Sequence, residues 1–190
     1  PPYGDVQWGQ SVAEFALGLT ICGLRRIPQT YNDMIKSHET WDYSAPGTDL
    51  GKPGQRSQQM GDDTRFTNGT IGGKRVRIVG AGNIGARYAA WCAALGADVV
   101  VWDPIAKDAT FNIAGARRCF DKLELVKDAE IFVPMMPLFD ATRGIVNAEM
   151  IDALPTGCLV IAVTRAQICD CDALYRRVLN DKLSMAADVF

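Results

Sequence analysis

Histidine is nearly absent from this sequence, since His38 is the only one in 190 residues. Cys169 and Cys171, one residue apart, resemble half of a metal site, but the sequence offers no further paired ligands. We therefore expect no metal. We interpret His38 as a solvent-exposed side chain rather than a catalytic one, because it falls on the surface of a predicted helix.

Long apolar runs are missing too. No segment reaches the length of about 18 apolar residues that spans a bilayer. The first residues also lack the basic and apolar regions of a signal peptide. We expect a soluble cytoplasmic protein with no membrane partner.

Neither sign of charge dominates, because 20 Lys and Arg stand against 22 Asp and Glu, for a formal net charge of −2. Without a basic stripe to neutralise phosphates, we expect no nucleic-acid partner. Nor is a disulfide framework indicated, because most cysteines fall in apolar segments, where reduced cysteine packs as a small hydrophobic residue. The six are Cys22, Cys92, Cys119, Cys158, Cys169 and Cys171.

The length of the chain suits one domain. With 190 residues, 48% of them hydrophobic, the chain can bury one good core but not two. We interpret residues 1–190 as a single domain. Because the sequence opens on Pro1-Pro2 without a methionine and stops inside a predicted strand, we expect a domain excised from a longer protein.

Helical periodicity begins at Ser11. Ser11 and Glu14 match a capping box, and apolar residues then recur every three or four positions up to Ile27. We predict a helix from Ser11 to Ile27 and a second helical segment at 30–37. Between residues 42 and 73 the periodicity vanishes and Gly, Pro and polar residues dominate, which predicts a surface loop of about thirty residues.

After this loop, apolar strands alternate with amphipathic helices. The alternation is typical of a parallel sheet covered on both faces, so we predict an α/β fold of the Rossmann, doubly wound type. The predicted strands are Arg75–Val79, Ala97–Trp102, Arg117–Phe120, Ile131–Met135, Leu159–Val163 and Met185–Val189, and the predicted helices are Ile84–Leu95, Lys122–Lys127, Ala148–Leu154 and Asp172–Asn180.

Gly80, Gly82 and Gly85 form a GxGxxG motif between the first predicted strand and its helix. Alone the motif is weak, but here it stands where glycines allow a tight turn and let the backbone approach a pyrophosphate closely. The N–H groups and dipole of the following helix would hold that anion. The sequence therefore predicts a dinucleotide site.

Asp103 ends the second predicted strand, 18 residues past Gly85. A carboxylate at this point can accept hydrogen bonds from both hydroxyls of an adenosine ribose, and it would repel a 2′-phosphate. No arginine follows Asp103 directly, so we predict NAD as the cofactor. Lys107 leaves NADP open as the alternative.

Four blocks of the sequence, taken together, resemble the NAD-binding domain of the D-isomer-specific 2-hydroxyacid dehydrogenases. They are far more specific than the glycine motif, because they fix order and spacing across four separate strand ends. That family normally has two domains, so the resemblance implies that the substrate-binding domain lies outside this chain. The blocks are Ser11 to Ile27, Gly73 to Pro104, Met136 to Val146 (MPLFDATRGIV) and Ile161 to Phe190.

The resemblance places Arg165 where the family has an arginine that binds the substrate carboxylate and polarises the keto oxygen. A guanidinium suits this role, because its planar fork matches a carboxylate and stays charged. The alternative interpretation, a surface arginine paired with Asp170 or Asp172, stays open.

The resemblance also assigns cofactor contacts. It implies that Asp188 accepts from the nicotinamide carboxamide and that Asn83 and Ile84 meet the pyrophosphate. Lining positions along the dinucleotide are Met136, Val163 and Thr164.

Three positions depart from the family pattern. The family usually has Asn at the position of Ala162, Gly at Ala166, and often His or Asn near Met135. The loop at 42–73 is also longer than the family leads us to expect, by roughly twenty residues.

The family's catalytic Glu and His are expected beyond Phe190. We therefore expect the parent protein to transfer hydride between NAD and a D-2-hydroxy acid or 2-keto acid, and this chain to bind NAD but catalyse little. The main alternative is an NAD-sensing, corepressor-like binding protein on the same fold. A different Rossmann oxidoreductase, such as an alanine dehydrogenase or an adenosylhomocysteine hydrolase, is disfavoured by the block from Arg165 to Asp170.

In the family, the helix here at Ser11 to Ile27 packs against its mate across a twofold axis. Ala13, Gly18 and Gly23 are small enough to allow close approach, so we expect a homodimer. A face buried within one chain would give much the same pattern.

Overall fold

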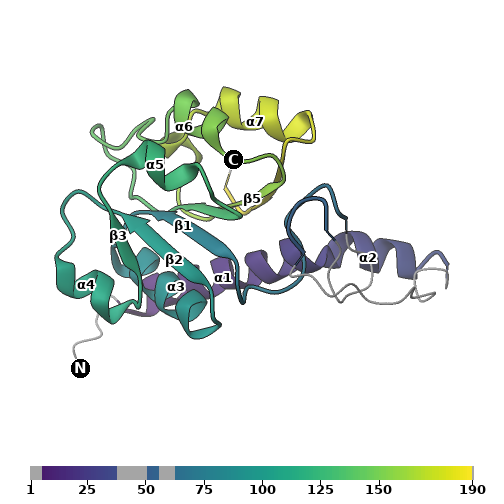
Figure 1. Cartoon of the computed structure of the whole chain (residues 1–190), viewed down its shortest axis with the longest axis horizontal. Helices are drawn as coiled ribbons and strands as arrows, with labels where there is room; N and C mark the ends of the chain where they lie inside the picture. The colour runs from purple at the N-terminus through teal and green to yellow at the C-terminus, as the bar shows by residue number, and fades with distance from the viewer. Residues whose placement is uncertain (1–5, 38–50, 56–62, 190) are drawn as a thin grey trace.

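A six-stranded parallel sheet forms the centre of the molecule (Figure 1). The computed structural model describes residues 6–37, 51–55 and 63–189. The strand order is β3-β2-β1-β4-β5-β6, and each neighbouring pair is parallel, which confirms the predicted doubly wound Rossmann arrangement. The strands are β1 (Arg75–Val79), β2 (Asp98–Trp102), β3 (Arg117–Cys119), β4 (Ile131–Pro134), β5 (Cys158–Ala162) and β6 (Leu183–Ala187).

Helices cover both faces of this sheet, α1, α3 and α4 on one side and α5, α6 and α7 on the other (Figure 1). Because side chains alternate along a strand, β1 contributes Val76 and Ile78 to the first layer and Val79 to the second. Central strands buried on both faces explain the continuous apolar runs in the sequence. The helices are α1 (Val6–Arg25), α2 (Ile27–Met34), α3 (Asn83–Ala94), α4 (Asp108–Ile113), α5 (Lys122–Val126), α6 (Ala148–Ala153) and α7 (Cys171–Leu179).

The first helix corrects the predicted start at Ser11. α1 already begins at Val6, so Ser11 lies inside the helix and no capping box forms there. The Glu14 carboxylate instead accepts from the Gln10 amide one turn earlier, at 2.7 Å. At its other end the helix stops at Arg26, whose left-handed backbone (φ 49°) separates α1 from α2.

Part of the predicted 42–73 loop is packed rather than exposed. Residues 51–55 and 63–73 contain neither helix nor strand, as expected. Thr67 and Asn68 are buried, however, and the neighbouring backbone reaches the body of the domain, where the Thr67 N–H donates to the Gly157 carbonyl and the Gly69 N–H to the Leu24 carbonyl. The described part of the loop therefore lies against the body of the domain. His38 falls outside the described residues.

An ion-pair network holds the amino edge of the sheet. The Arg77 side chain is only 3% exposed, and its Nη2 lies 2.7 Å from Asp128 Oδ2 and 3.1 Å from Asp98 Oδ2. These carboxylates raise the pKa of Arg77 against the opposing effect of its burial. These charged side chains pair with one another at the amino edge. Ligands of doubly wound folds bind at the opposite, carboxyl edge.

Candidate functional site

The carboxyl edge of the sheet carries a cavity of about 550 Å³. It lies where the ends of β4, β5 and β6 meet the start of α3, the position at which doubly wound folds bind ligands. α1 adds one side chain to its wall. The lining residues are Val12, Gly82, Asn83, Ile84, Met135, Pro137, Leu138, Val163, Thr164, Arg165, Asp188 and Val189.

Each of the three motif glycines is explained by a different feature of the structure. Gly80 has a φ of 109°, and a side chain there would lie 2.9 Å from the Met135 carbonyl oxygen. A Cβ at Gly85 would lie 2.1 Å from the Gly80 carbonyl oxygen, so only glycine lets α3 approach the strand end. Gly82, by contrast, faces open space, with nothing within 4 Å of its Cβ position. The two outer glycines shape the turn, and the middle one leaves room for a ligand.

This turn fits the pyrophosphate of a dinucleotide. Gly82 is the N-cap of α3 and offers no side chain to satisfy the N–H groups of the first turn. Those N–H groups and the positive end of the helix dipole point at the open space above Gly82. The donor set and the space both suit an anion, so the residues present fit NAD.

Asp103 is more tightly held than its sequence position suggests. Its side chain is 6% exposed, and Oδ2 accepts from the Ala81 N–H at 2.7 Å. Oδ1 accepts from the N–H groups of Ile105 and Ala106, both at 2.9 Å. The carboxylate therefore ties the phosphate loop to the turn after β2, and three of its acceptor positions are in use. Sequence reasoning missed this second role, because it depends on backbone N–H groups that no residue type reveals.

Arg165 lines the cavity three residues past Ala162, the last residue of β5. Its side chain is exposed, and Nη1 donates to the Thr164 carbonyl at 2.7 Å. The alternative pairing with Asp170 is not seen, because the Asp170 carboxylate caps α7 through the Ala173 N–H. No ion pair with Asp172 is formed in the part of the chain that the structure describes. The guanidinium is thus available at the cavity.

The cavity brings together seven of the eleven site residues predicted from the sequence: Gly82, Asn83, Ile84, Val163, Thr164, Arg165 and Asp188. Gly80 and Gly85 shape the turn behind it, and Asp103 binds the far side of the loop. Met136 does not line the cavity. It packs in the core layer of α5 and α6, with its sulfur 2.9 Å from the Cβ position of Gly80, and Met135 lines the wall instead.

Asp188 follows β6 and is an exposed residue of the cavity wall. Its N–H donates to the Ala162 carbonyl at 3.1 Å, which continues the pairing of β6 with β5 beyond the last strand residue. The cavity also has lining residues that the sequence did not identify, Val12 and Val189 among them. Pro137 and Leu138 belong to the block from Met136 to Val146 that resembles the family, so the resemblance could have identified them as lining residues.

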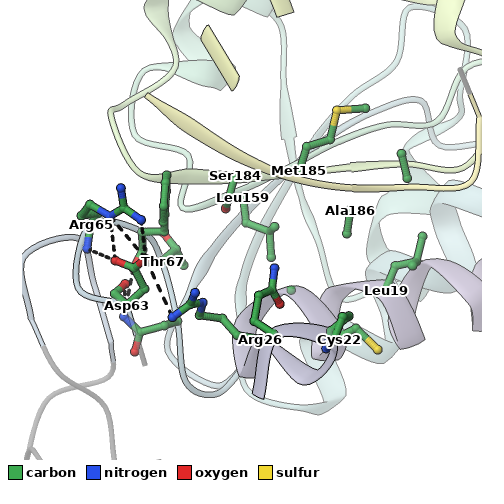
Figure 2. Close-up of a pocket in the computed structure, with 16 residues that line it drawn as sticks. Leu19, Cys22, Arg26, Asp63, Arg65, Thr67, Leu159, Ser184, Met185 and Ala186 are labelled. Atoms are coloured by element: carbon green, nitrogen blue, oxygen red, sulfur yellow. Dashed lines mark hydrogen bonds and ion pairs between the residues drawn. The ribbon is translucent and has the colours of Figure 1, made fainter. Parts of the chain in front are cut away.

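A second cavity, of about 440 Å³, lies between α1, β6 and residues 63–68 (Figure 2). Leu19 and Cys22 of α1 face Met185 and Ala186 of β6 across it. At one end Arg65 binds Asp63, with Nη2 to Oδ2 at 2.8 Å, and this hydrogen bond holds the pKa of the Asp63 carboxyl below its usual value. None of the predicted site residues lines this cavity.

Metal ligands do not gather anywhere in the described ranges, where no group of three or more His, Cys, Asp or Glu side chains is found. Burial raises the pKa of the Cys169 thiol to about 12, so it stays protonated at neutral pH and is a poor metal ligand. Within the same ranges, no helix combines the length and the apolar character that crossing a bilayer requires.

Comparison with known proteins agrees with this geometry. The family described as "D-isomer specific 2-hydroxyacid dehydrogenase, NAD binding domain" matches residues 17–190. The chain belongs to this family. It is the NAD-binding domain, and NAD is its cofactor.

Relatives of known activity are similar along almost the whole domain. D-3-phosphoglycerate dehydrogenase of Bacillus subtilis (strain 168) is 30% identical over 182 residues, which is 95% of this chain and 30% of that protein. The enzyme of the same name from Methanocaldococcus jannaschii is 26% identical, again over 95% of this chain and 30% of its own length. The chain thus spans about a third of the curated relatives it matches.

Solved structures share the fold. A phosphoglycerate oxidoreductase from Vibrio cholerae superposes with a TM-score of 0.76 at 24% identity, over 96% of this chain and 52% of that one. D-lactate dehydrogenase from Aquifex aeolicus, solved with NAD and lactic acid, gives 0.74 at 23% identity, over 96% and 48%. The domain corresponds to about half of each of these chains.

Proposed function

We propose that the NAD-binding domain works within an oxidoreductase that transfers hydride between NAD and a D-2-hydroxy acid, or reduces the corresponding 2-keto acid. The observation that carries this proposal is the exposed Arg165 guanidinium at the mouth of the cavity that the phosphate loop also lines. NAD, when bound, supplies or accepts the hydride. The relatives named above are dehydrogenases, which favours an enzyme over an NAD-sensing binding protein.

Arg165 binds and orients the acid substrate in this proposal. Its planar fork can hold a carboxylate through two hydrogen bonds, and its charge can stabilise the developing alkoxide at the adjacent carbon. Among the described residues, the Thr164 carbonyl alone accepts a hydrogen bond from the guanidinium, so a substrate carboxylate can displace that contact easily. Thr164 itself is anchored, because its hydroxyl lies 3.3 Å from the Pro134 carbonyl at the end of β4.

The remaining site residues hold the cofactor. Gly82, Asn83 and Ile84 present their N–H groups to the pyrophosphate, and Asp103 offers its free acceptor position to the adenosine ribose. Asp188 accepts from the nicotinamide carboxamide. Gly80 and Gly85 keep the turn open, and Val163 and Thr164, with Met135 in place of Met136, contribute packing along the dinucleotide.

Kinetics of the full-length protein test the role of Arg165. We expect Arg165→Gln to lower kcat/KM for glyoxylate, pyruvate or hydroxypyruvate by about a hundredfold or more. NADH affinity should stay near that of the unchanged protein, because the residue contacts the substrate rather than the dinucleotide. Arg176→Gln is the matched control, since this exposed arginine pairs with Asp152 on the outer helices. Unchanged turnover in Arg165→Gln would contradict the proposal.

We also propose that the protein forms a homodimer through α1 and acts in the cytoplasm. Of the three small residues in the predicted dimer face, Ala13 and Gly23 pack inside the domain, the latter against Leu159. Gly18 alone is exposed, between the exposed apolar side chains of Phe15 and Ile21. All six cysteines are unpaired, as is usual in a reducing compartment.

A further inference from the structure

Arg87 lies one turn into α3, on the same face as Asn83, the first residue of that helix. Its Nη1 donates to the Asn83 carbonyl at 2.6 Å. Helical side chains lean toward the N-terminus, and four residues rise by only about 6 Å, which a long arginine side chain can span. The guanidinium therefore sits beside the first turn of α3, against Asn83, which lines the cavity.

The start of α1 meets the start of α3 at the same place. Gly9, in the first turn of α1, is buried, and a Cβ there would lie 3.3 Å from Asn83 Cβ and 3.7 Å from Arg87 Nη1. The two helices thus bring the positive ends of their dipoles together, with a guanidinium between them. This junction is strongly favourable for an anion.

A cation at this position is unfavourable in the absence of an anion, because it faces the positive end of the helix dipole. No carboxylate in the described ranges forms an ion pair with Arg87, and its guanidinium donates to the Asn83 carbonyl instead. The arginines of the amino edge differ, since Arg75, Arg77 and Arg117 all pair with carboxylates. Ion pairing among the described residues therefore does not explain the position of Arg87.

We propose that Arg87 is a further cofactor-binding residue, whose guanidinium neutralises the pyrophosphate of NAD held on the phosphate loop. Gly82, Asn83 and Ile84 supply N–H groups but no charge, and Arg165, the arginine that lines the cavity, is assigned to the substrate. The guanidinium leaves the Asn83 carbonyl and donates to a phosphate oxygen, a stronger, charge-assisted hydrogen bond. This role rests on the NAD site described above and not on hydride transfer.

Binding measurements on ADP-ribose and adenosine separate this role from a structural one, because only ADP-ribose carries a pyrophosphate. We expect Arg87→Gln to weaken ADP-ribose and NADH binding by about tenfold, and Arg87→Lys to recover part of this loss. Adenosine, measured by competition, should bind equally to all variants. The salt dependence of ADP-ribose binding should also fall in Arg87→Gln, since one charge contact is lost.

Arg117→Gln is the matched control, because it removes an equal charge from the amino edge of the sheet and should leave ligand binding unchanged. The melting temperature of ligand-free Arg87→Gln should stay level or rise, since a cation leaves the positive end of α3. Unchanged ADP-ribose affinity in Arg87→Gln would overturn the role of Arg87, and so would an equal loss for adenosine. An unmodified chain that binds no ADP-ribose would overturn the cofactor site itself, together with this role.

Discussion

Asp103 links the cofactor site to the stability of the fold. Its carboxylate accepts three backbone N–H groups, from Ala81, Ile105 and Ala106, which fixes the phosphate loop against the turn after β2. A carboxylate can do this because it is purely an acceptor, whereas an amide also carries donors. The acid that would bind ribose therefore also shapes the loop that would bind pyrophosphate.

Asp103→Asn tests both roles. One side of the amide would place its NH₂ against a backbone N–H, so we expect a loss of about 1–3 kcal/mol in the free energy of unfolding. NADH binding should weaken in the same variant, while the unmodified domain should bind NADH more tightly than NADPH. The checks are urea unfolding and tryptophan-fluorescence titration. Asp108→Asn is the control, because that carboxylate is exposed and pairs with Arg118 at the surface. Equal behaviour of the two variants would contradict the assignment.

Buried thiols and one buried amine set the alkaline stability of the domain. Burial raises the pKa of Cys92 and of Cys169 to about 12, and that of Cys158 further, while thiols of the unfolded chain ionise near 9. The stabilising effect of these protonated thiols is complete below pH 9 and is lost as pH rises toward 12. Burial lowers the pKa of Lys74 to about 8, against about 10.5 when unfolded, so its effect has the opposite sign. Stability rises as Lys74 deprotonates.

The free energy of unfolding should therefore peak near pH 9. Lys74 acts alone between pH 8 and 9, and above that range three thiols outweigh one amine, each with a slope of up to about 1.4 kcal/mol per pH unit. Urea unfolding at pH 7.5, 9 and 10.5 measures this curve. In Cys92→Ala the free energy of unfolding should fall less steeply above pH 9, by up to about 1.4 kcal/mol per pH unit, because one titrating thiol is lost. A flat curve up to pH 10.5 would refute the account.

At the scale of elements, β1, β2, β4 and β5 were predictable because each is a short, mostly apolar run buried on both faces. β1 was predicted with its bounds as observed, and β2, β4 and β5 to within one residue at each end, because Gly and polar residues flank them. β6 starts and ends two residues earlier than predicted. α4 was missed, since it has only six residues and buries only Phe111, too little for a periodic pattern.

The candidate site was predictable only where residue type decides function. Glycines in the turn and Arg165 after β5 could be located from motif and resemblance, because no other residue type does their chemistry. Met135 and Met136 could not be told apart, because neighbouring residues at a strand end face opposite sides and the sequence does not fix which side holds the ligand. Arg87 was missed because its position depends on how two helix starts meet.

At the scale of the whole molecule, our proposal makes the domain one wall of an active site. The chain spans about a third of its curated relatives, so the whole protein's substrate selectivity remains part of our proposal. At the carboxyl edge of the sheet, the phosphate loop and Arg165 line the same cavity. The opposite, amino edge carries the ion pairs around Arg77.

The exposed face of α1 is the proposed surface between two copies of the domain. Phe15 is 49% and Ile21 43% exposed, and Gly18 lies between them with nothing within 4 Å of its Cβ position. Glycine costs a helix about 1 kcal/mol relative to alanine, so an exposed glycine here is unfavourable unless something approaches it closely. A twofold partner would pack this face of α1 against the same face of the second copy and bury the Phe15 ring of each copy.

Gly18→Ala tests the proposed dimer, because the substitution should stabilise a monomer but weaken a dimer. In a monomer the substitution would raise the free energy of unfolding by roughly 0.5–1 kcal/mol, because it removes an unfavourable helical glycine. In the proposed dimer the added methyl group separates the two helices, so we expect weaker self-association. Sedimentation measurements should show a larger dissociation constant for Gly18→Ala and a monomer for Ile21→Lys, with Leu179→Lys, an equally apolar exposed position on α7, as the control. A single monomeric species at all concentrations of the unmodified chain would contradict a dimer through α1. Any gain in stability from Gly18→Ala would then be an effect on the helix alone.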